Sequence, residues 1–353
     1  MSVEGSGGNR VRCYRLARQW SQLELARRAN ISRAAVSAIE SERLVPSVAA
    51  ALSLARTLEC SVEELFGNVP GSGESLSNQP RWAWRPPTPN ARFWAARIGT
   101  QRLLFPVEPT PIGMLAGDGR ADGKQPVVNE RLADMTLVVA SCDPAIGMLA
   151  RLYEQVTGFR MLAFCRSSQV ALELLQRNLV HVAGVHVATP SQPDKNQQVS
   201  QGVCGPEIRL IRVATWEAGL ALNDKLAGKS VASLVKRDRQ WVGREVGSGA
   251  RHCQDELWTA RPEPERIARD HRSVAEAIRL GWADVGVCLR LVAEEAGLDF
   301  LSVRSEYYDL CFLAEQEQDP RILALIRVLQ SVAYRRLLAD LPGYDTAATG
   351  LIG

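Results

Sequence analysis

The chain has 353 residues, more than one ordinary hydrophobic core needs, which predicts two or three domains. Hydrophobic residues make up 46% and charged residues 23% of it, as in soluble globular proteins. The net charge of +3 is too small to indicate a partner, and the longest apolar runs are far shorter than a membrane span. The first ten residues show no signal-peptide pattern, so we expect a cytoplasmic protein without a membrane partner.

The eight cysteines are scattered along the chain and form no CxxC pair. This pattern argues against a zinc ribbon or a disulfide framework, and it predicts reduced thiols and no metal site. Cys142, Cys165 and Cys253 lie near segments assigned below to a ligand cleft. For these three, a thiol sensor or a soft-metal site is the alternative to simple burial, which is the commoner state of a free cysteine.

Residues 9–67 have the pattern of a compact series of short helices. Apolar residues recur at helical spacing, and Ser21, Ser32 and Ser47 each precede such a run. A serine in this position accepts hydrogen bonds from the free N–H groups of the first helical turn. Between residues 10 and 43 there are eight arginines against three glutamates, a surplus of positive charge typical of surfaces that contact DNA phosphates.

The segment QLELARRANISRAAVSAIESERLVPS, residues 22–47, predicts two helices joined by a tight turn. Asn30 tolerates positive φ at the turn, and Ala26 is small where the two helices cross. Val36 and Ile39 share one face of the second helix, which predicts a buried anchor. The other face carries small or hydrogen-bonding side chains, so this helix can enter the major groove of DNA.

Residues 10–66 resemble the helix-turn-helix of the phage-repressor-like (Cro/C1, or XRE) family, although the family usually has glycine where this chain has Asn30. The resemblance implies binding to a pseudo-palindromic double-stranded DNA operator as a homodimer. A helical domain used only for protein contacts is the alternative. Arg33 suits a guanine edge, and Gln22 suits a phosphate at a helix start. The predicted DNA-binding residues are Gln22, Ser32, Arg33, Ala34, Ser37 and Arg43.

Two segments separate this region from the rest of the chain. Residues 68–80 are rich in Gly, Pro, Ser and Asn, which predicts a flexible linker. Residues 81–128 contain Trp82, Trp84, Phe93 and Trp94, many prolines and one short β-like run. We expect a small β-rich connector there, which packs on the next domain or forms a dimer contact.

From about residue 130 onward, short apolar strands alternate with amphipathic helices. This alternation predicts an α/β domain with a mostly parallel sheet. A single long helix over residues 320–341 is expected near the end, and residues 190–205 are expected to form a loop.

Residues 134–345 resemble the type 2 periplasmic-binding-protein-like domain that occurs fused to helix-turn-helix regulators and is related to molybdate-binding proteins. The resemblance rests on SCDPAIGMLA, REVGSGARHCQDEL and AIRLGWADVGVCLR in that order, although threonine is more usual at Ala250. It implies a multidomain protein. An all-α lambda-repressor-like helix-turn-helix domain (1–67) is followed, after the linker and connector, by an α/β two-lobed ligand-sensing domain (129–353).

Ligands of such folds lie at the carboxyl ends of strands, where helices begin. Serine hydroxyls and free N–H groups there, together with Arg251, favour an oxyanion such as molybdate or tungstate, or a small carboxylate metabolite. Asp143 would repel an anion, so capping of its helix is the simpler interpretation, and His186 either contacts ligand or is an interior histidine. The predicted ligand-binding residues are Ser141, Cys142, Asp143, Ser167, Ser168, His186, Gly247, Ser248, Gly249, Ala250, Arg251 and Tyr308.

These features predict a ligand-responsive transcription regulator. We expect no enzyme activity and no cofactor beyond a bound oxyanion, because the sequence has no nucleophile elbow, metal-spaced His/Cys cluster or phosphate loop. Two alternatives stay open. One is a ligand-independent DNA-binding repressor whose second domain only dimerises. The other is an enzyme of molybdenum-cofactor metabolism with a DNA-binding appendage.

Overall fold

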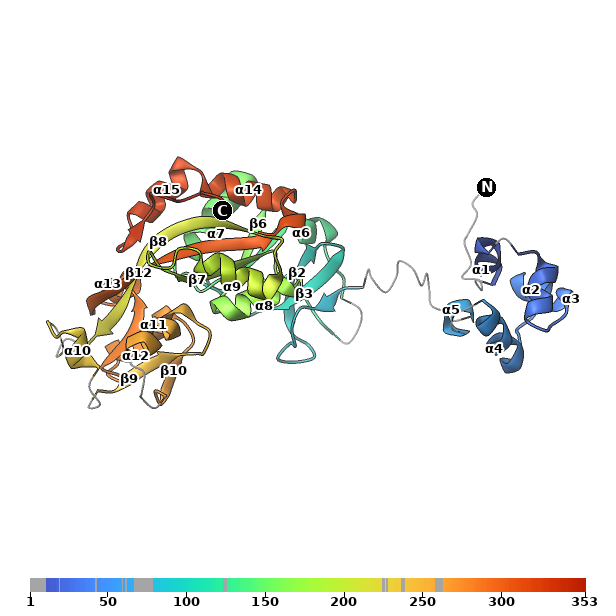
Figure 1. Ribbon diagram of the computed structural model, residues 1–353, viewed down its shortest axis with the longest axis horizontal. Coiled ribbons are helices and arrows are strands. Elements are labelled where there is room, and N and C mark those ends of the chain that lie inside the picture. The colour runs from blue at the N-terminus through green and yellow to red at the C-terminus, as the bar shows by residue number, and fades with distance from the viewer. Residues whose placement is uncertain are drawn as a thin grey trace. The chain divides into compact units, whose positions relative to one another are not determined.

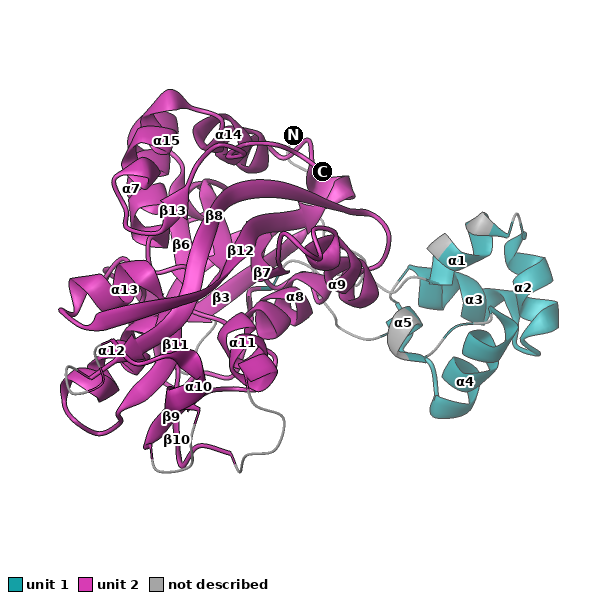
Figure 2. Cartoon of the chain, turned by 60° about the vertical axis from the view of Figure 1, so that its left-hand side comes forward, with its two compact units in different colours: residues 1–79 teal, residues 80–353 magenta. Residues whose placement is uncertain are grey.

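The computed structural model divides the chain into two compact units, residues 1–79 and residues 80–353 (Figure 2). Most of the predicted linker, residues 68–78, lies outside the described residues. No helix in the described part of the chain is long and apolar enough to cross a membrane. The structure describes residues 11–18, 20–41, 43–58, 60, 62–66, 79–122, 126–223, 226, 228–235, 239–257 and 263–353.

The N-terminal unit consists of short helices. The hydroxyls of Ser21, Ser32 and Ser47 accept backbone N–H groups at the starts of α2, α3 and α4, which confirms the predicted caps. Asn30 has a φ of 52°, which confirms the predicted turn between α2 and α3. The helices are α1 (Val11–Ala17), α2 (Gln22–Arg28), α3 (Arg33–Glu40), α4 (Val48–Thr57) and α5 (Val62–Phe66).

A buried ion pair ties the first three helices of this unit together around its hydrophobic core. Val36 and Ile39 are buried in that core, as the pattern predicts. Arg15 in α1 donates to the Glu40 carboxylate in α3 through Nε at 2.6 Å and Nη2 at 3.1 Å. Gln22 at the start of α2 donates to the same carboxylate at 2.8 Å. The Glu40 side chain therefore fixes how α3 packs on α1 and α2.

The C-terminal unit begins with a four-stranded sheet in the order β1-β3-β2-β4. Trp94 in β2 and Phe105 in β3 are buried against Phe164 of the main sheet, with ring centroids 5.9 Å and 5.5 Å from it. Segment 81–128 therefore packs on the main sheet and shares its core. Its strands are β1 (Arg81–Trp82), β2 (Arg92–Ile98), β3 (Gln101–Pro106) and β4 (Gly119–Arg120).

The main sheet has nine strands among the described residues, in the order β10-β9-β11-β8-β12-β7-β5-β6, with β13 paired to β8. Its strands are β5 (Thr136–Ala140), β6 (Arg160–Phe164), β7 (Val182–Ala188), β8 (Ile208–Leu222), β9 (Trp241–Arg244), β10 (Arg266–Ala268), β11 (Val285–Leu289), β12 (Asp299–Leu313) and β13 (Tyr344–Asp345). Its helices are α6 (Glu130–Asp134), α7 (Ile146–Thr157), α8 (Ser168–Gln176), α9 (Lys195–Cys204), α10 (Val231–Leu234), α11 (Gly249–Leu257), α12 (His271–Arg279), α13 (Arg290–Glu295), α14 (Pro320–Leu329) and α15 (Val332–Ala339).

The prediction of a mostly parallel sheet is wrong, because the sheet is mixed. Parallel pairs lie toward its two ends, where β5 pairs with β6 and β7, and β9 with β10 and β11. The centre is antiparallel. Strand β8 pairs with β11 on one side and with β12 on the other, and β12 pairs in turn with β7. Residues 299–313 form one long strand, β12.

Two lobes form around the long strands β8 and β12, as Figure 1 shows. We call β5, β6 and β7 with helices α7–α9 the first lobe. We call β9, β10 and β11 with helices α10–α13 the second lobe. Trp216 in β8 lies opposite Glu306 in β12. This pair lies at the junction of the lobes, because β12 pairs with β7 on one side of it and β8 pairs with β11 on the other.

Two further expectations from the sequence are corrected by the structure. The predicted long final helix is two helices, because α14 ends at Leu329 and Ser331 caps α15 by accepting the N–H of Tyr334. The expected loop 190–205 contains the helix α9. The buried amide of Asn196 in α9 accepts the N–H groups of Val187 and Ala188, which anchors this helix on β7.

Candidate functional site

Five of the six predicted DNA-binding residues lie at the N-cap of α3, in α3 itself or on the loop that follows it. Ser32, Arg33, Ala34 and Arg43 are exposed, while Ser37 is half-buried. The Ser32 hydroxyl accepts the N–H of Ala35 at 3.0 Å. Neither Arg33 nor Arg43 forms an ion pair with another described residue, so both charges are free to meet phosphates or bases. The accessible face of α3 therefore has the chemistry that the sequence predicts.

Gln22 differs from the other five residues in this set. Its amide group donates to the buried Glu40 carboxylate at 2.8 Å, and the side chain is only partly exposed. Its amide nitrogen thus helps to hold α2 against α3. The structure gives Gln22 a positioning role beneath the exposed face of α3.

Most of the predicted ligand-binding residues meet where the two lobes face each other. Ser141 Oγ lies 2.7 Å from the Tyr308 hydroxyl. Cys142 Sγ lies 3.0 Å from His186 Nε2, and the Ser168 hydroxyl accepts the N–H of His186 at 3.3 Å. These residues are all buried. The ends of β5, β6 and β7 therefore supply one wall of an interlobe site, as the fold-based expectation requires.

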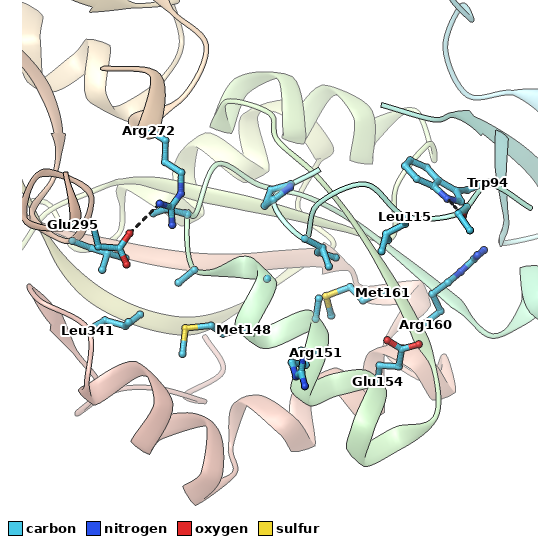
Figure 3. A pocket seen from close by; sticks show the side chains of 18 residues that line it. Trp94, Leu115, Met148, Arg151, Glu154, Arg160, Met161, Arg272, Glu295 and Leu341 are labelled. Carbon is cyan, nitrogen blue, oxygen red and sulfur yellow. Dashed lines mark hydrogen bonds and ion pairs between the residues drawn. The ribbon is translucent and has the colours of Figure 1, made fainter. Parts of the chain in front are cut away.

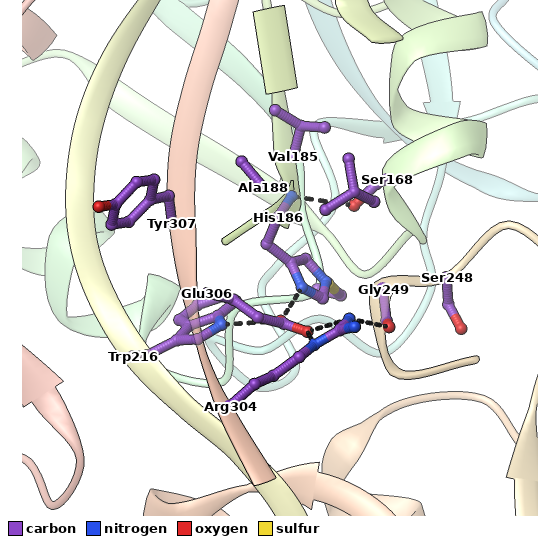
Figure 4. A network of polar contacts seen from close by, with 12 residues as sticks. Ser168, Val185, His186, Ala188, Trp216, Ser248, Gly249, Arg304, Glu306 and Tyr307 are labelled. Atoms are coloured by element: carbon purple, nitrogen blue, oxygen red, sulfur yellow. Dashed lines mark hydrogen bonds and ion pairs between the residues drawn. The ribbon is translucent and has the colours of Figure 1, made fainter. Parts of the chain in front are cut away.

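A carboxylate that the sequence analysis missed organises this wall (Figure 4). Glu306 Oε2 lies 2.9 Å from His186 Nδ1 and accepts Trp216 Nε1 at 3.2 Å. Arg304 donates to Glu306 Oε1 through two nitrogens at 2.8 and 2.6 Å. Burial alone would lower the pKa of His186, but Cys142 and Glu306 raise it to about 10. His186 Nδ1–H thus donates to Glu306, and Nε2 faces Cys142.

The glycine-rich turn of the second lobe packs directly on the first lobe. A Cβ at Gly249 would overlap the ring and the carbonyl oxygen of His186, so only glycine fits there. Gly247 has a φ of 85° and lies against the side chain of Gln169. Ser248 uses its hydroxyl within the turn, donating to the Glu245 carbonyl, and Ala250 is buried in the core of the second lobe. The two lobes are therefore closed on each other at this point.

Asp143 accepts two hydrogen bonds with one of its oxygens. Oδ1 accepts the N–H of Ala145 at 2.9 Å and the hydroxyl of Tyr344 at 2.8 Å. The N-cap residue of α7 is Ala145, so Asp143 forms a turn just before the helix and is not its cap. Oδ2 is buried without a hydrogen-bond partner among the described residues. Burial raises the pKa of Asp143 to about 6.

The arginine with a free nitrogen among the described residues of the interlobe site is Arg244, and not the predicted Arg251. The Arg251 guanidinium contacts Asp255 at 2.8 Å and Glu263 at 3.0 Å, so two carboxylates already neutralise its charge. Arg244, at the end of β9, is only 1% exposed, and its Nη1 has no hydrogen-bond partner among the described residues. Its other nitrogens approach the half-exposed Glu245 at 3.3 and 3.4 Å.

The charge of Arg244 acts on the segment that follows β6, where Ser167 begins the turn into α8. Burial raises the pKa of Cys165 to about 12, and the positive charge of Arg244 acts in the opposite direction on the same thiol. Two residues after Cys165, the Ser167 hydroxyl is buried and has no partner among the described residues. A buried cation and a buried free hydroxyl thus lie on facing lobes.

His271, the first residue of α12, was also missed by the sequence analysis. It is buried, and neither ring nitrogen has a hydrogen-bond partner among the described residues. Its ring centroid lies 5.9 Å from that of His186. Burial, then the charges of Arg244 and His186, hold the pKa of His271 well below its usual value, so the imidazole is neutral. The rule that ligands lie where strands end and helices begin would have selected both Arg244 and His271.

A pocket of about 590 Å³ lies beside this site, at the start of α7 (Figure 3). Segment 111–116 and helices α7, α12 and α13 all contribute to its lining. Two of its arginines are engaged, because Arg272 pairs with Glu295 at 3.0 Å and Arg160 pairs with Asp118. Pro144 and Ala145, which follow Asp143, line the same pocket. No pattern in the sequence predicts this cavity.

Comparisons with known proteins agree with this division of the chain. The profile of the PBP superfamily domain matches residues 149–330, and a helix-turn-helix profile matches residues 11–65. The uncharacterized protein YvgK from Bacillus subtilis (strain 168) is 31% identical over 164 residues, which cover 44% of this chain and 52% of that protein. The chain thus spans about half the length of this curated relative.

Two solved structures are among those to which the chain is similar. One is the tungstate ABC transporter from Geobacter sulfurreducens, with 12% identity, a TM-score of 0.45, and coverage of 58% of this chain and 98% of that chain. The other is a putative phosphate ABC transporter substrate-binding protein with bound phosphate from Clostridium perfringens, with 11% identity, a TM-score of 0.46, and coverage of 58% and 97%. The chain belongs to the PBP superfamily and carries an N-terminal helix-turn-helix domain of the XRE type.

Proposed function

We propose that this protein is a cytoplasmic transcription regulator whose DNA binding responds to a small ligand held between the lobes. The N-terminal unit supplies the exposed start of α3, where Arg33 forms no ion pair with another described residue. The C-terminal unit supplies a buried site with polar groups that lack partners among the described residues. We propose that the protein binds a pseudo-palindromic operator as a homodimer, because helix-turn-helix proteins of this kind pair on two half-sites.

The ligand that we propose is a small oxyanion such as molybdate or tungstate, or a small carboxylate metabolite. The observation that carries this proposal is Arg244, a buried guanidinium with one nitrogen unpartnered among the described residues. Glu245 pairs with the other nitrogens of this guanidinium, and an anion would supply the partner that the buried Nη1 lacks among the described residues. The Ser167 hydroxyl and the N-terminus of α8 offer hydrogen-bond donors on the facing lobe.

We propose that the protein acts by binding and not by catalysis. An anion that contacts Arg244 from the second lobe and Ser167 from the first would favour the closed arrangement of the lobes. Such a ligand can change the DNA affinity only as far as it binds the closed arrangement of the lobes more tightly than an open one. Coupling free energies of roughly 1–3 kcal/mol are usual.

The test is a thermal-shift screen of the full chain with molybdate, tungstate, phosphate and small carboxylates. An anion at 100 times its dissociation constant stabilises the folded state by about 2.7 kcal/mol, so the melting temperature should rise. The rise should disappear in Arg244→Met and persist in the matched control Arg251→Met, whose guanidinium is engaged by Asp255 and Glu263. If no anion raises the wild-type melting temperature, the C-terminal unit is not an anion sensor, and a purely dimerising role gains support.

A further inference from the structure

The interior of the C-terminal unit brings one cysteine and two histidines together. Cys142 follows β5, His186 lies in β7, and His271 begins α12. One Sγ and one ring nitrogen from each histidine all lie within 4.8 Å of one another, and the three residues are 4%, 1% and 2% exposed. We propose that these three side chains form a binding site for a thiophilic transition-metal ion, either Zn(II) or Cu(I).

The spacing and the atom types both fit such an ion. Metal–sulfur bonds of about 2.3 Å and metal–nitrogen bonds of about 2.0–2.1 Å place ligand atoms of one ion roughly 3.5 Å apart. Cys142 Sγ and His186 Nε2 are 3.0 Å apart, so a small separation of the two side chains admits the ion between them. A thiolate with imidazoles selects zinc or copper, whereas magnesium and calcium prefer oxygen ligands.

His186 is already oriented as a metal ligand. Its Nδ1–H donates to Glu306 at 2.9 Å, which directs Nε2 toward the sulfur of Cys142. Glu306 is itself held by Arg304 and Trp216. Histidine ligands usually donate their second ring nitrogen to a carboxylate in this way, which fixes both the tautomer and the ring orientation. The ion would take the place of the present contact between Cys142 Sγ and His186 Nε2.

His271 supplies the independent observation that points to a ligand. Neither of its ring nitrogens has a hydrogen-bond partner among the described residues, although the side chain is only 2% exposed. Buried polar groups without partners are rare and unfavourable. Coordination by one ring nitrogen would satisfy this side chain, and its ring already lies beside that of His186.

The three ligands come from both lobes. Cys142 and His186 belong to the first lobe, and His271 belongs to the second. An ion bonded to all three would therefore link the lobes and hold them closed. This site goes beyond the proposed anion response, since it uses neither Arg244 nor Ser167 and needs no DNA binding.

The experiment measures metal binding by the reduced, metal-stripped full chain. Zn(II) and, under anaerobic conditions, Cu(I) are titrated separately against a chromophoric chelator. We expect one equivalent of at least one of the two ions to bind per chain, and Cys142→Ser and His271→Gln each to weaken that binding roughly 100-fold or more. Cys165→Ser, which removes a nearby thiol outside the cluster, should leave the affinity unchanged.

His271→Gln keeps the test decisive, because the His271 ring forms no hydrogen bond to a described residue that the substitution would break. Circular dichroism checks that this variant is folded. With Co(II) as a spectroscopic probe, a thiolate-to-metal charge-transfer band should appear in the wild type and in Cys165→Ser, and be absent in Cys142→Ser. The proposal is overturned if the folded wild type binds neither Zn(II) nor Cu(I), or if both ligand variants bind as tightly as the wild type.

Discussion

Single buried carboxylates position the functional side chains in both units. Glu40 receives hydrogen bonds from Arg15 and Gln22 beneath α3, and Glu306 receives them from Arg304 and His186 between the lobes. Breaking a buried ion pair by removing one partner is strongly destabilising, because the remaining charge is left buried without a partner. From inside the protein, Glu40 therefore sets the position of Gln22, and Glu306 sets that of His186.

Glu40→Gln tests this role in the N-terminal unit. Removing the charge leaves Arg15 buried and unpaired, and we expect the unit to lose about 3 kcal/mol of stability at neutral pH. Hydrogen–deuterium exchange of peptides from residues 11–66, measured in the full chain, reports this loss. Exchange that is no faster than in the wild type would contradict the assigned role.

The same pair predicts a pH dependence of this unit. Burial alone would raise the pKa of Glu40, but the hydrogen bonds from Arg15 and Gln22 lower it below 4.5. A carboxyl whose pKa is lower in the folded state contributes stability above its unfolded pKa, and that stability is lost as the pH falls through the folded value. The protection factors of residues 11–66, which are corrected for the intrinsic pH dependence of amide exchange, should therefore fall below pH 4.5 in the wild type, and less so in Glu40→Gln.

Arg33 is the exposed residue on which DNA recognition should depend most. It lies at the start of α3 without an ion pair to any described residue. Losing a base contact costs roughly 1–3 kcal/mol, so Arg33→Ala should weaken operator binding by about 5- to 150-fold and relax base preference. Arg56→Ala on α4 is a matched control for charge, and fluorescence anisotropy with operator DNA should show a smaller change for it. Equal effects of the two variants would mean that α3 does not read the DNA.

At the scale of elements, the closeness of the two lobes depends on the glycine-rich turn before α11. A Cβ at Gly249 would overlap both ring and backbone atoms of His186. Overpacking of this kind usually costs about 1–3 kcal/mol, because neighbouring groups must shift. The turn therefore sets how closely the second lobe approaches the first.

Gly249→Ala should destabilise the C-terminal unit by roughly 1–3 kcal/mol and separate the lobes at His186. Gly202→Ala in α9 is the matched control. A Cβ there meets nothing within 4 Å, and alanine is the better helix former. Denaturant unfolding of the full chain should show a loss for the first variant and no loss for the second. A Gly249→Ala protein as stable as the wild type would show that Gly249 and His186 are not in close contact.

The elements show which parts of the fold a single sequence can reveal. Strands β5, β6 and β7 follow from their apolar runs, and the turn at Asn30 follows from the conformational freedom of that residue. Strand direction does not follow from such runs, so the antiparallel centre formed by β8 and β12 was missed. Arg244 and His271 were missed because they lie far from His186 in sequence, and only the folded sheet brings them to the same interlobe site.

At the scale of the whole molecule, a DNA-binding unit and a ligand-binding unit occur in one chain. In the proposed regulator, ligand bound to the second unit changes the DNA affinity of the first. This coupling is reciprocal, so operator DNA must change the affinity for the ligand by the same factor. The central claim therefore concerns one free energy that links the two units.

The most direct measurement of that claim is a titration of operator DNA with the full chain, with and without saturating anion, followed by fluorescence anisotropy. The operator fragment would come from the promoter upstream of the coding sequence. We expect the dissociation constant for DNA to change by about 5- to 150-fold in the wild type and not in Arg244→Met. Identical DNA affinities with and without an anion that is shown to be bound would contradict the account.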